Sequence, residues 1–148
     1  MRILALVCLI FWACESLPER ILEVRFPKAC WIYPDTVWGS LTVVNPPLCK
    51  ALELRIELEE TYPWRNLYLL LWLEAPDGFR ERSRLEVVFS DTLGRWYASN
   101  RKFQTFILPK ASFASRGRYR IGILPYIRSD TVNGIRRIAL YAHPCREE

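Results

Sequence analysis

The chain has one His and one Met in 148 residues, and only six Gly against ten Pro. A single imidazole excludes sites built from several histidines. No CxxC or Cys/His zinc spacing occurs, and no glycine-rich phosphate loop is present. His143 precedes Pro144 and Cys145. We interpret it as a solvated tail histidine, because neighbouring positions in a Pro-interrupted tail do not orient a catalytic dyad. The sequence predicts no catalytic residue, no metal and no cofactor.

The acidic side chains provide no clear catalytic pair or metal site either. Glu59 and Glu60 are adjacent, and successive strand side chains face opposite ways, so they do not form an acid/base pair. The aspartates in predicted turns could either bind one calcium ion together or cap their own turns separately. We favour capping for all four: Asp35, Asp77, Asp91 and Asp130.

Apolar and aromatic residues are abundant, at 51% and 14%, and 25% of residues are charged. This composition excludes a disordered chain, and the length predicts one domain. Lys and Arg number 21 against 16 Asp and Glu, which makes the net charge +5. In a secreted chain such an excess favours anionic envelope surfaces or an acidic partner, and we expect no nucleic-acid partner.

The N-terminus reads as a signal peptide, because residues 3–13 are apolar and too few to span a bilayer. It ends in Ala13-Cys14, which resembles a bacterial lipobox, although Trp12 is bulkier than usual there. We therefore expect a signal peptide over 1–13, lipidation at Cys14, a tether over 14–20 and one domain over 21–148. The alternative is ordinary secretion with an unmodified thiol.

Alternating apolar and polar residues predict strands almost throughout the domain, and no segment has a 3.6-residue apolar period. Turn residues separate these strands at regular intervals. The pattern predicts an all-β fold, an antiparallel β-sandwich (jelly-roll-like) of about seven to eight strands. The expected strands are residues 21–26, 37–44, 52–59, 66–75, 80–89, 102–108, 118–127 and 135–142.

One expected strand carries an aromatic row. Its odd positions, Leu67, Leu69, Leu71 and Leu73, are predicted to face the core, so the even positions face outward. Either the protein's own loops or a partner must cover such a row. The candidate partner surface is Tyr62, Trp64, Tyr68 and Trp72.

Six arginines form a second candidate surface, either solvated strand faces or a contact for phosphate-bearing lipid or an acidic partner. They are Arg116, Arg118, Arg120, Arg128, Arg136 and Arg137.

Three cysteines remain after Cys14, so at least one stays outside any intramolecular disulfide. If strands 37–44 and 135–142 are antiparallel neighbours, Cys30 and Cys145 meet beside their ends at about 5.5 Å between Cα atoms. Cys49 lies at the other end of the first strand. We therefore predict a Cys30–Cys145 disulfide and an odd thiol at Cys49.

Taken in order, these landmarks resemble the gliding-motility-associated lipoprotein family GldH of Bacteroidota. The most specific match is the segment Tyr-Pro-Trp-Arg-Asn-Leu-Tyr-Leu at residues 62–69, followed by Pro-Asp-Gly at 76–78. Residues 35–37, 91–96, 117–119 and 133–135 extend it, with Trp31, Arg128 and the lipobox-like Cys14. The resemblance implies a lipid-anchored envelope protein, with the outer membrane favoured over the inner. It also implies support of gliding motility linked to type IX secretion, and contacts with other envelope proteins of that apparatus.

Two functions from different classes are open. The first is a non-enzymatic subunit of an envelope assembly that acts through protein–protein contacts. The second is a carbohydrate- or glycan-binding β-sandwich that uses the aromatic row. We favour the first, since Asn66 is the only obvious polar residue among the aromatics of that face.

Overall fold

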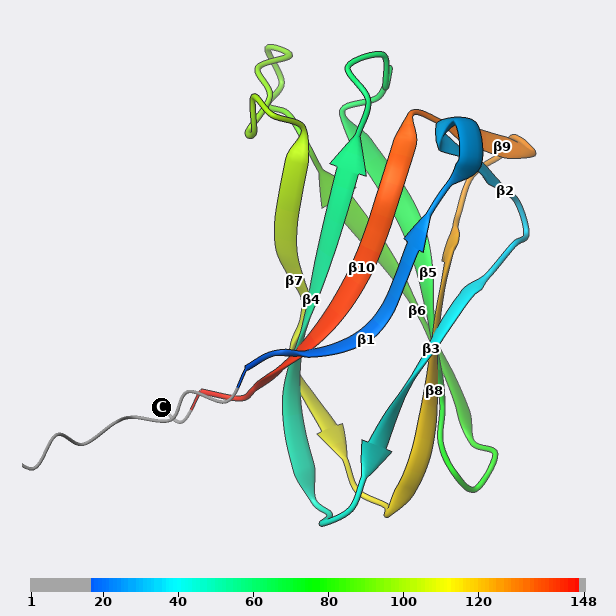
Figure 1. Cartoon of the computed structure of the whole chain (residues 1–148), viewed down its shortest axis with the longest axis vertical. Helices are drawn as coiled ribbons and strands as arrows, with labels where there is room; N and C mark the ends of the chain where they lie inside the picture. Colours follow the sequence, from blue (N-terminus) through cyan, green and yellow to red (C-terminus); the bar gives the residue numbers. More distant parts are fainter. Residues whose placement is uncertain (1–16, 147–148) are drawn as a thin grey trace, which may run out of the picture.

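The computed structural model describes residues 17–146 (Figure 1). The predicted signal peptide, Cys14 and the first part of the tether lie outside the described residues. Within them, ten strands and one 3-10 turn make up the regular structure, and no helix has the length and apolarity to cross a membrane.

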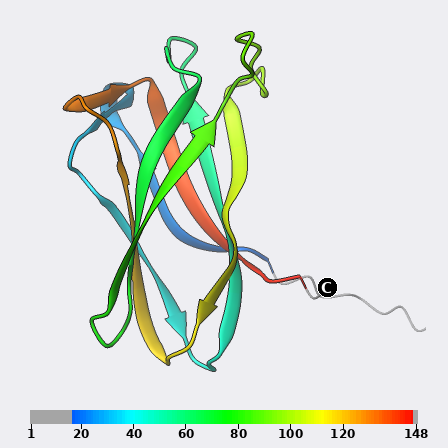
Figure 2. The same ribbon diagram turned by 180° about the vertical axis from the view of Figure 1, so that it is seen from behind.

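Eight longer strands form two four-stranded antiparallel sheets, which Figures 1 and 2 show from opposite sides. The β4 sheet has the order β1 (Glu19–Arg25), β10 (Ile135–Pro144), β4 (Leu48–Leu58), β7 (Lys102–Phe113). The β5 sheet has the order β3 (Val37–Val43), β8 (Gly117–Pro125), β5 (Asn66–Glu74), β6 (Arg80–Val88). This is the strand order of a jelly roll, so the predicted all-β sandwich is confirmed.

Alternation along the strands explains how the two sheets pack. In β4, Leu54 and Ile56 are buried between the sheets, whereas Arg55 and Glu57 face outward. In β5 the odd leucines 67, 69 and 71 are buried as predicted. Burying these apolar rows supplies the main driving force for folding, at about 25 cal/mol per Å².

A short strand pair lies at one end of the sandwich and was not predicted. Strand β2 (Cys30–Ile32) pairs with β9 (Thr131–Asn133), after the 3-10 turn Pro27–Ala29. Three residues are too few to show an alternating pattern. The pair is held by Trp31, which is 1% exposed and donates from Nε1 to the Asp35 carbonyl at 2.8 Å. The β2–β9 pair fixes the segment between β8 and β10, residues 126–134, over this end of the fold.

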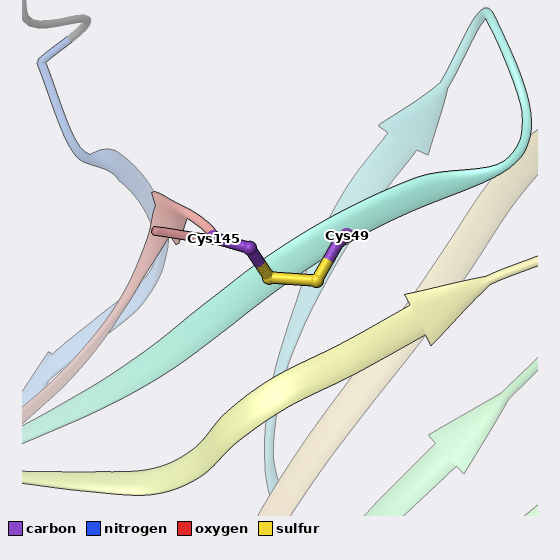
Figure 3. The surroundings of a disulfide bond; sticks show 2 residues. All are labelled: Cys49 and Cys145. Atoms are coloured by element: carbon purple, nitrogen blue, oxygen red, sulfur yellow. A yellow bond between two sulfur atoms is a disulfide. The ribbon is translucent and has the colours of Figure 1, made fainter. Parts of the chain in front are cut away.

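The predicted cysteine pairing is wrong. The disulfide joins Cys49 to Cys145, with 5.6 Å between the Cα atoms (Figure 3). Cys30 is a free thiol. The prediction assumed that strands 37–44 and 135–142 are neighbours. In the structure β3 pairs with β8 in the β5 sheet, whereas β10 lies between β1 and β4. Pro144 is opposite Lys50, so the next antiparallel pair of positions is Cys145 and Cys49.

His143 is not a solvated tail residue. It lies within β10 with a quarter of its side chain exposed, and its Nε2 is 2.9 Å from Glu53 Oε2. Its ring contacts Phe106 edge-on at 5.4 Å between centroids. The neighbouring Cys145 is taken up by the disulfide, so these two residues form no dyad.

Two of the four aspartates cap turns as predicted. Asp77 Oδ1 accepts from the Phe79 amide at 2.9 Å, and Asp91 Oδ1 accepts from the amides of Leu93 and Arg95. These bonds and the Arg95 side chain lower the pKa of the Asp91 carboxyl.

Candidate functional site: an aromatic and arginine-rich face

The outer face of the β5 sheet carries two of the four residues of the predicted aromatic row. Since the odd positions of β5 face the core, Tyr68 and Trp72 point outward. Tyr68 is 41% exposed and Trp72 is partly buried. Trp64, in the loop before β5, is 65% exposed.

A glycine lets the row continue across the sheet. Trp72 is opposite Gly122 on β8, which in turn is opposite Trp38 on β3. A Cβ at Gly122 would lie 2.7 Å from the ring of Trp38, so the indole lies directly over the glycine. Two Trp side chains therefore share one cross-strand line of the outer face.

Arginines stack on these rings. The guanidinium of Arg120 lies 4.4 Å from the ring centroid of Trp38, and that of Arg82 lies 5.6 Å from Trp72. Arg84 lies 5.9 Å from the ring of Tyr126, just after β8. Such cation–π contacts favour positions of each guanidinium near a ring, while its N–H groups can still donate hydrogen bonds. We call this surface the aromatic–arginine face; it comprises Trp38, Tyr68, Trp72, Arg82, Arg84, Arg120 and Tyr126.

One end of the face opens into a groove with a volume of about 1020 Å³. At this end, just past β8, the Tyr126 amide donates a hydrogen bond to the Tyr68 carbonyl of β5, at 2.8 Å. Beyond it, the chain after β8 turns toward β9, and the groove lies between residues 62–68 and 126–133. Its lining includes Trp64, Tyr68, Arg84, Tyr126, Arg128 and Asn133.

The groove is basic. None of the described residues that line it is Asp or Glu. Arg84 and Arg128 line it, and neither has an ion pair to another residue in 17–146. By contrast, Arg120 on the same outer face is paired with Glu74 at 2.8 Å. The two groove arginines therefore keep their hydrogen-bonding capacity for a ligand.

Tyr62 does not belong to the exposed row. Its side chain is 3% exposed, its hydroxyl donates to the Asn66 carbonyl at 2.9 Å, and its ring packs edge-on against Phe89. Burial raises the pKa of this hydroxyl. The prediction extended the alternation of β5 backward through Pro63, but β5 begins only at Asn66. Tyr62 sits in a turn after β4, closed by the hydrogen bond that its amide N–H donates to the Glu59 carbonyl.

The six predicted arginines do not form one surface. Arg118 and Arg120 lie on the outer face of β8, Arg128 lines the groove, and Arg116 is in the turn between β7 and β8. The remaining two belong to the β4-sheet side. Arg136 lies 3.6 Å from Glu59, and Arg137 is paired with Glu23 at 2.7 Å and Glu57 at 3.3 Å. These partners raise the pKa of Arg137 and occupy its donors.

The predicted site missed Trp38, Tyr126, Arg82 and Arg84. Tyr126 shares the parity of Arg118 and Arg120 along β8, so the alternation contained a signal for it. Arg82 and Arg84 join the face through the β5–β6 hairpin, in which Trp72 is opposite Arg82 and Leu70 is opposite Arg84. Trp38 joins it only because β3 pairs with the distant β8, which the local pattern does not specify.

The arrangement is suited to binding. In the described part of the chain, no group of three or more His, Cys, Asp or Glu side chains could hold a metal ion. Exposed Trp, Tyr and Arg on a rigid sheet are typical of contact surfaces. Fold and site together define a jelly-roll protein with a basic, aromatic surface.

Comparison with known proteins narrows this class. Residues 23–140 match the family described as GldH lipoprotein, and the chain belongs to that family. It is similar to a protein of Flavobacterium johnsoniae named gliding motility lipoprotein GldH, with 21% identity over 131 residues. That similarity covers 85% of this chain and 80% of the relative. Membership associates the chain with gliding motility and with membrane-anchored proteins of the cell envelope.

Proposed function

We propose that this chain is a non-enzymatic, lipid-anchored subunit of gliding-motility machinery linked to type IX secretion. It acts by binding another envelope protein through the groove and the adjoining aromatic–arginine face. The observation that carries the proposal is the exposure of Trp64, Tyr68 and Tyr126 around a groove that also holds two arginines without ion pairs. Rings of this exposure, beside arginine, are the usual anchors of protein interfaces.

The proposed anchor fits this role. Glu19 of β1 is opposite Ala142, near the end of β10, and Arg25 is opposite Arg137, near its start. The chain therefore enters the domain about 20 Å, the length of β1, from the end that carries β9 and the groove. Figures 1 and 2 show the first strand starting beside the end of β10, away from β9. A lipid at Cys14, five residues before β1, would leave the groove accessible above the membrane. We propose the outer membrane as its location.

A glycan ligand is the second candidate, and one observation favours it. The structure brings Ser129, Thr131 and Asn133 to the groove beside the aromatic rings. These residues supply the polar side chains that the sequence row by itself lacked, since sugar hydroxyls need partners between stacking surfaces.

Anchoring is tested by replacing Cys14 with Ala. We expect the variant to fold and to leave the membrane fraction for the soluble envelope fraction, because acyl chains supply the membrane affinity. Retention of the variant in membranes after a high-salt wash would show that anchoring does not depend on Cys14.

The binding surface is tested with Trp64→Ala and a matched control, Phe79→Ala. Both side chains are 65% exposed, but Phe79 lies in the β5–β6 hairpin at the other end of the sheet. Pull-downs from envelope membranes should lose a specific partner with Trp64→Ala and retain it with Phe79→Ala. Equal capture by both variants contradicts the protein-contact proposal. A glycan screen that is positive for the wild type and negative for Trp64→Ala would favour the second candidate.

A further inference from the structure

We infer that the groove recognises carboxylates of an acidic, extended segment of a partner protein. The inference rests on the proposed function and names the chemistry of its partner. It assigns the carboxylate contacts to Arg84 and Arg128, and the contacts with neighbouring side chains of the segment to Trp64, Tyr68 and Tyr126.

Charge complementarity is the first argument. The groove holds two guanidinium groups, and its described lining contains no Asp or Glu to neutralise them. Several arginines elsewhere in the described chain do form ion pairs: Arg137 contacts two glutamates, and Glu74 contacts both Arg80 and Arg120. Arg84 and Arg128 line the same groove without a carboxylate partner, so an anionic ligand would gain a favourable electrostatic interaction with both.

Preorganisation is the second argument. Arg84 projects from the middle of β6, where its backbone is fixed by pairing with Leu70 of β5. Its guanidinium lies 5.9 Å from the ring centroid of Tyr126, which limits its rotamers. A guanidinium held on an aromatic ring presents a planar fork of donors that matches a carboxylate. The ordering cost on binding is correspondingly small.

Other occupants fit less well. The headgroups of the anchoring leaflet would lie near the start of β1, about 20 Å from the groove end. A neutral sugar could accept hydrogen bonds from Arg84 and Arg128 but would not neutralise their charge. Trp, Tyr and Arg together are the residues that dominate protein interfaces, which favours a peptide over an anionic glycan.

The test uses the full chain purified in detergent and a short fluorescent peptide of alternating Glu and Tyr, followed by anisotropy. Peptides with Gln or Lys in place of Glu measure the charge requirement. The groove variant carries Arg84→Gln with Arg128→Gln. The control carries Arg116→Gln with Arg118→Gln, which removes the same charge from exposed arginines outside the groove lining. Thermal melting confirms that each variant is folded.

We expect the Glu peptide to bind, the Gln and Lys peptides to bind much more weakly, and added salt to weaken binding. The groove variant should lose about tenfold or more in affinity, because charge-assisted hydrogen bonds are lost, and the control variant should bind as the wild type does. Equal binding of the Glu and Gln peptides, or equal loss in the two variants, would overturn the inference. Tighter binding of oligogalacturonate, or of phosphatidylglycerol vesicles, would assign the groove to a glycan or a lipid instead.

Failure of this inference is distinguishable from failure of the proposed function. If envelope partners are lost with Trp64→Ala but retained by the groove variant, the surface binds a protein without using carboxylates. If neither change affects capture, the proposed binding surface itself is wrong.

Discussion

Removing the Cys49–Cys145 disulfide should destabilise the domain strongly without changing its fold. The bridge spans 96 residues of sequence. A crosslink of that span lowers the entropy of the unfolded chain by an amount worth about 4.7 kcal/mol at 25 °C, and removal of native disulfides typically costs about 2–5 kcal/mol. The native strands need no rearrangement, since His143 and Pro144 already pair with residues 51 and 50 of β4.

The double variant Cys49→Ser with Cys145→Ser avoids leaving one reactive thiol. With an unfolding entropy of about 2.1 cal/mol/K per residue over roughly 130 ordered residues, we expect Tm to fall by about 7–17 °C. Differential scanning calorimetry measures this shift, and circular dichroism should show an unchanged β spectrum. Cys30→Ser is the matched control, because Cys30 is a free thiol, and we expect it to have little effect.

Peptide mapping under non-reducing conditions supplies the direct check of the bond. A linked pair of peptides containing residues 49 and 145 is expected. A crosslink that contains Cys30 would refute the pairing. A loss below about 1 kcal/mol in the double variant would refute the argument from unfolded-chain entropy.

Three further predictions concern packing and charge. Tyr62→Phe should cost about 1–2 kcal/mol in chemical denaturation, because the Asn66 carbonyl loses its donor, whereas Tyr62→Ala should cost about 3–5 kcal/mol; a cost near zero for both would mean that the side chain is not buried. Gly39→Ala should destabilise by about 2 kcal/mol or more, since its Cβ would lie 2.3 Å from the Ile21 carbonyl oxygen of β1, and Ser40→Ala is the neighbouring control. The hydrogen bond from Arg137 lowers the pKa of Glu23 below 4.5, so this carboxylate stabilises the fold above that pH, and the contribution is lost as pH falls through the lowered pKa. Unfolding followed from pH 7 to pH 3 should show a smaller loss of stability in Glu23→Gln than in the wild type, and identical profiles would show that the pair contributes nothing.

The sequence by itself determined which segments become strands and which side chains face the core. Alternation is a local property, and eight of the ten observed strands coincide with predicted segments. The odd leucines of β5 faced the core as expected, because the side-chain period of a strand is two whatever its neighbours are. The family could also be identified from the sequence, since the motif at residues 62–69 and the turn residues keep their order along the chain.

Only the tertiary structure decided which strands are neighbours. Backbone hydrogen bonds are the same for any pair of strands, so the local pattern did not reveal that β3 pairs with β8 rather than with β10. The pairing of β10 with β4 brings Cys145 beside Cys49, and the pairing of β3 with β8 keeps β3 away from β10. The β3–β8 pairing also places Trp38 on the same cross-strand line as Trp72, through Gly122.

The conformations of the loops also depended on the tertiary structure. A turn after β4 buried Tyr62, and the divergence of the chain after β8 opened the groove. The predicted arginines were divided between the two sheets, so that some are neutralised by glutamates from distant strands while Arg128 keeps its donors free in the groove. Contacts between residues far apart in sequence depend on long-range strand pairing, which alternation within one segment does not encode.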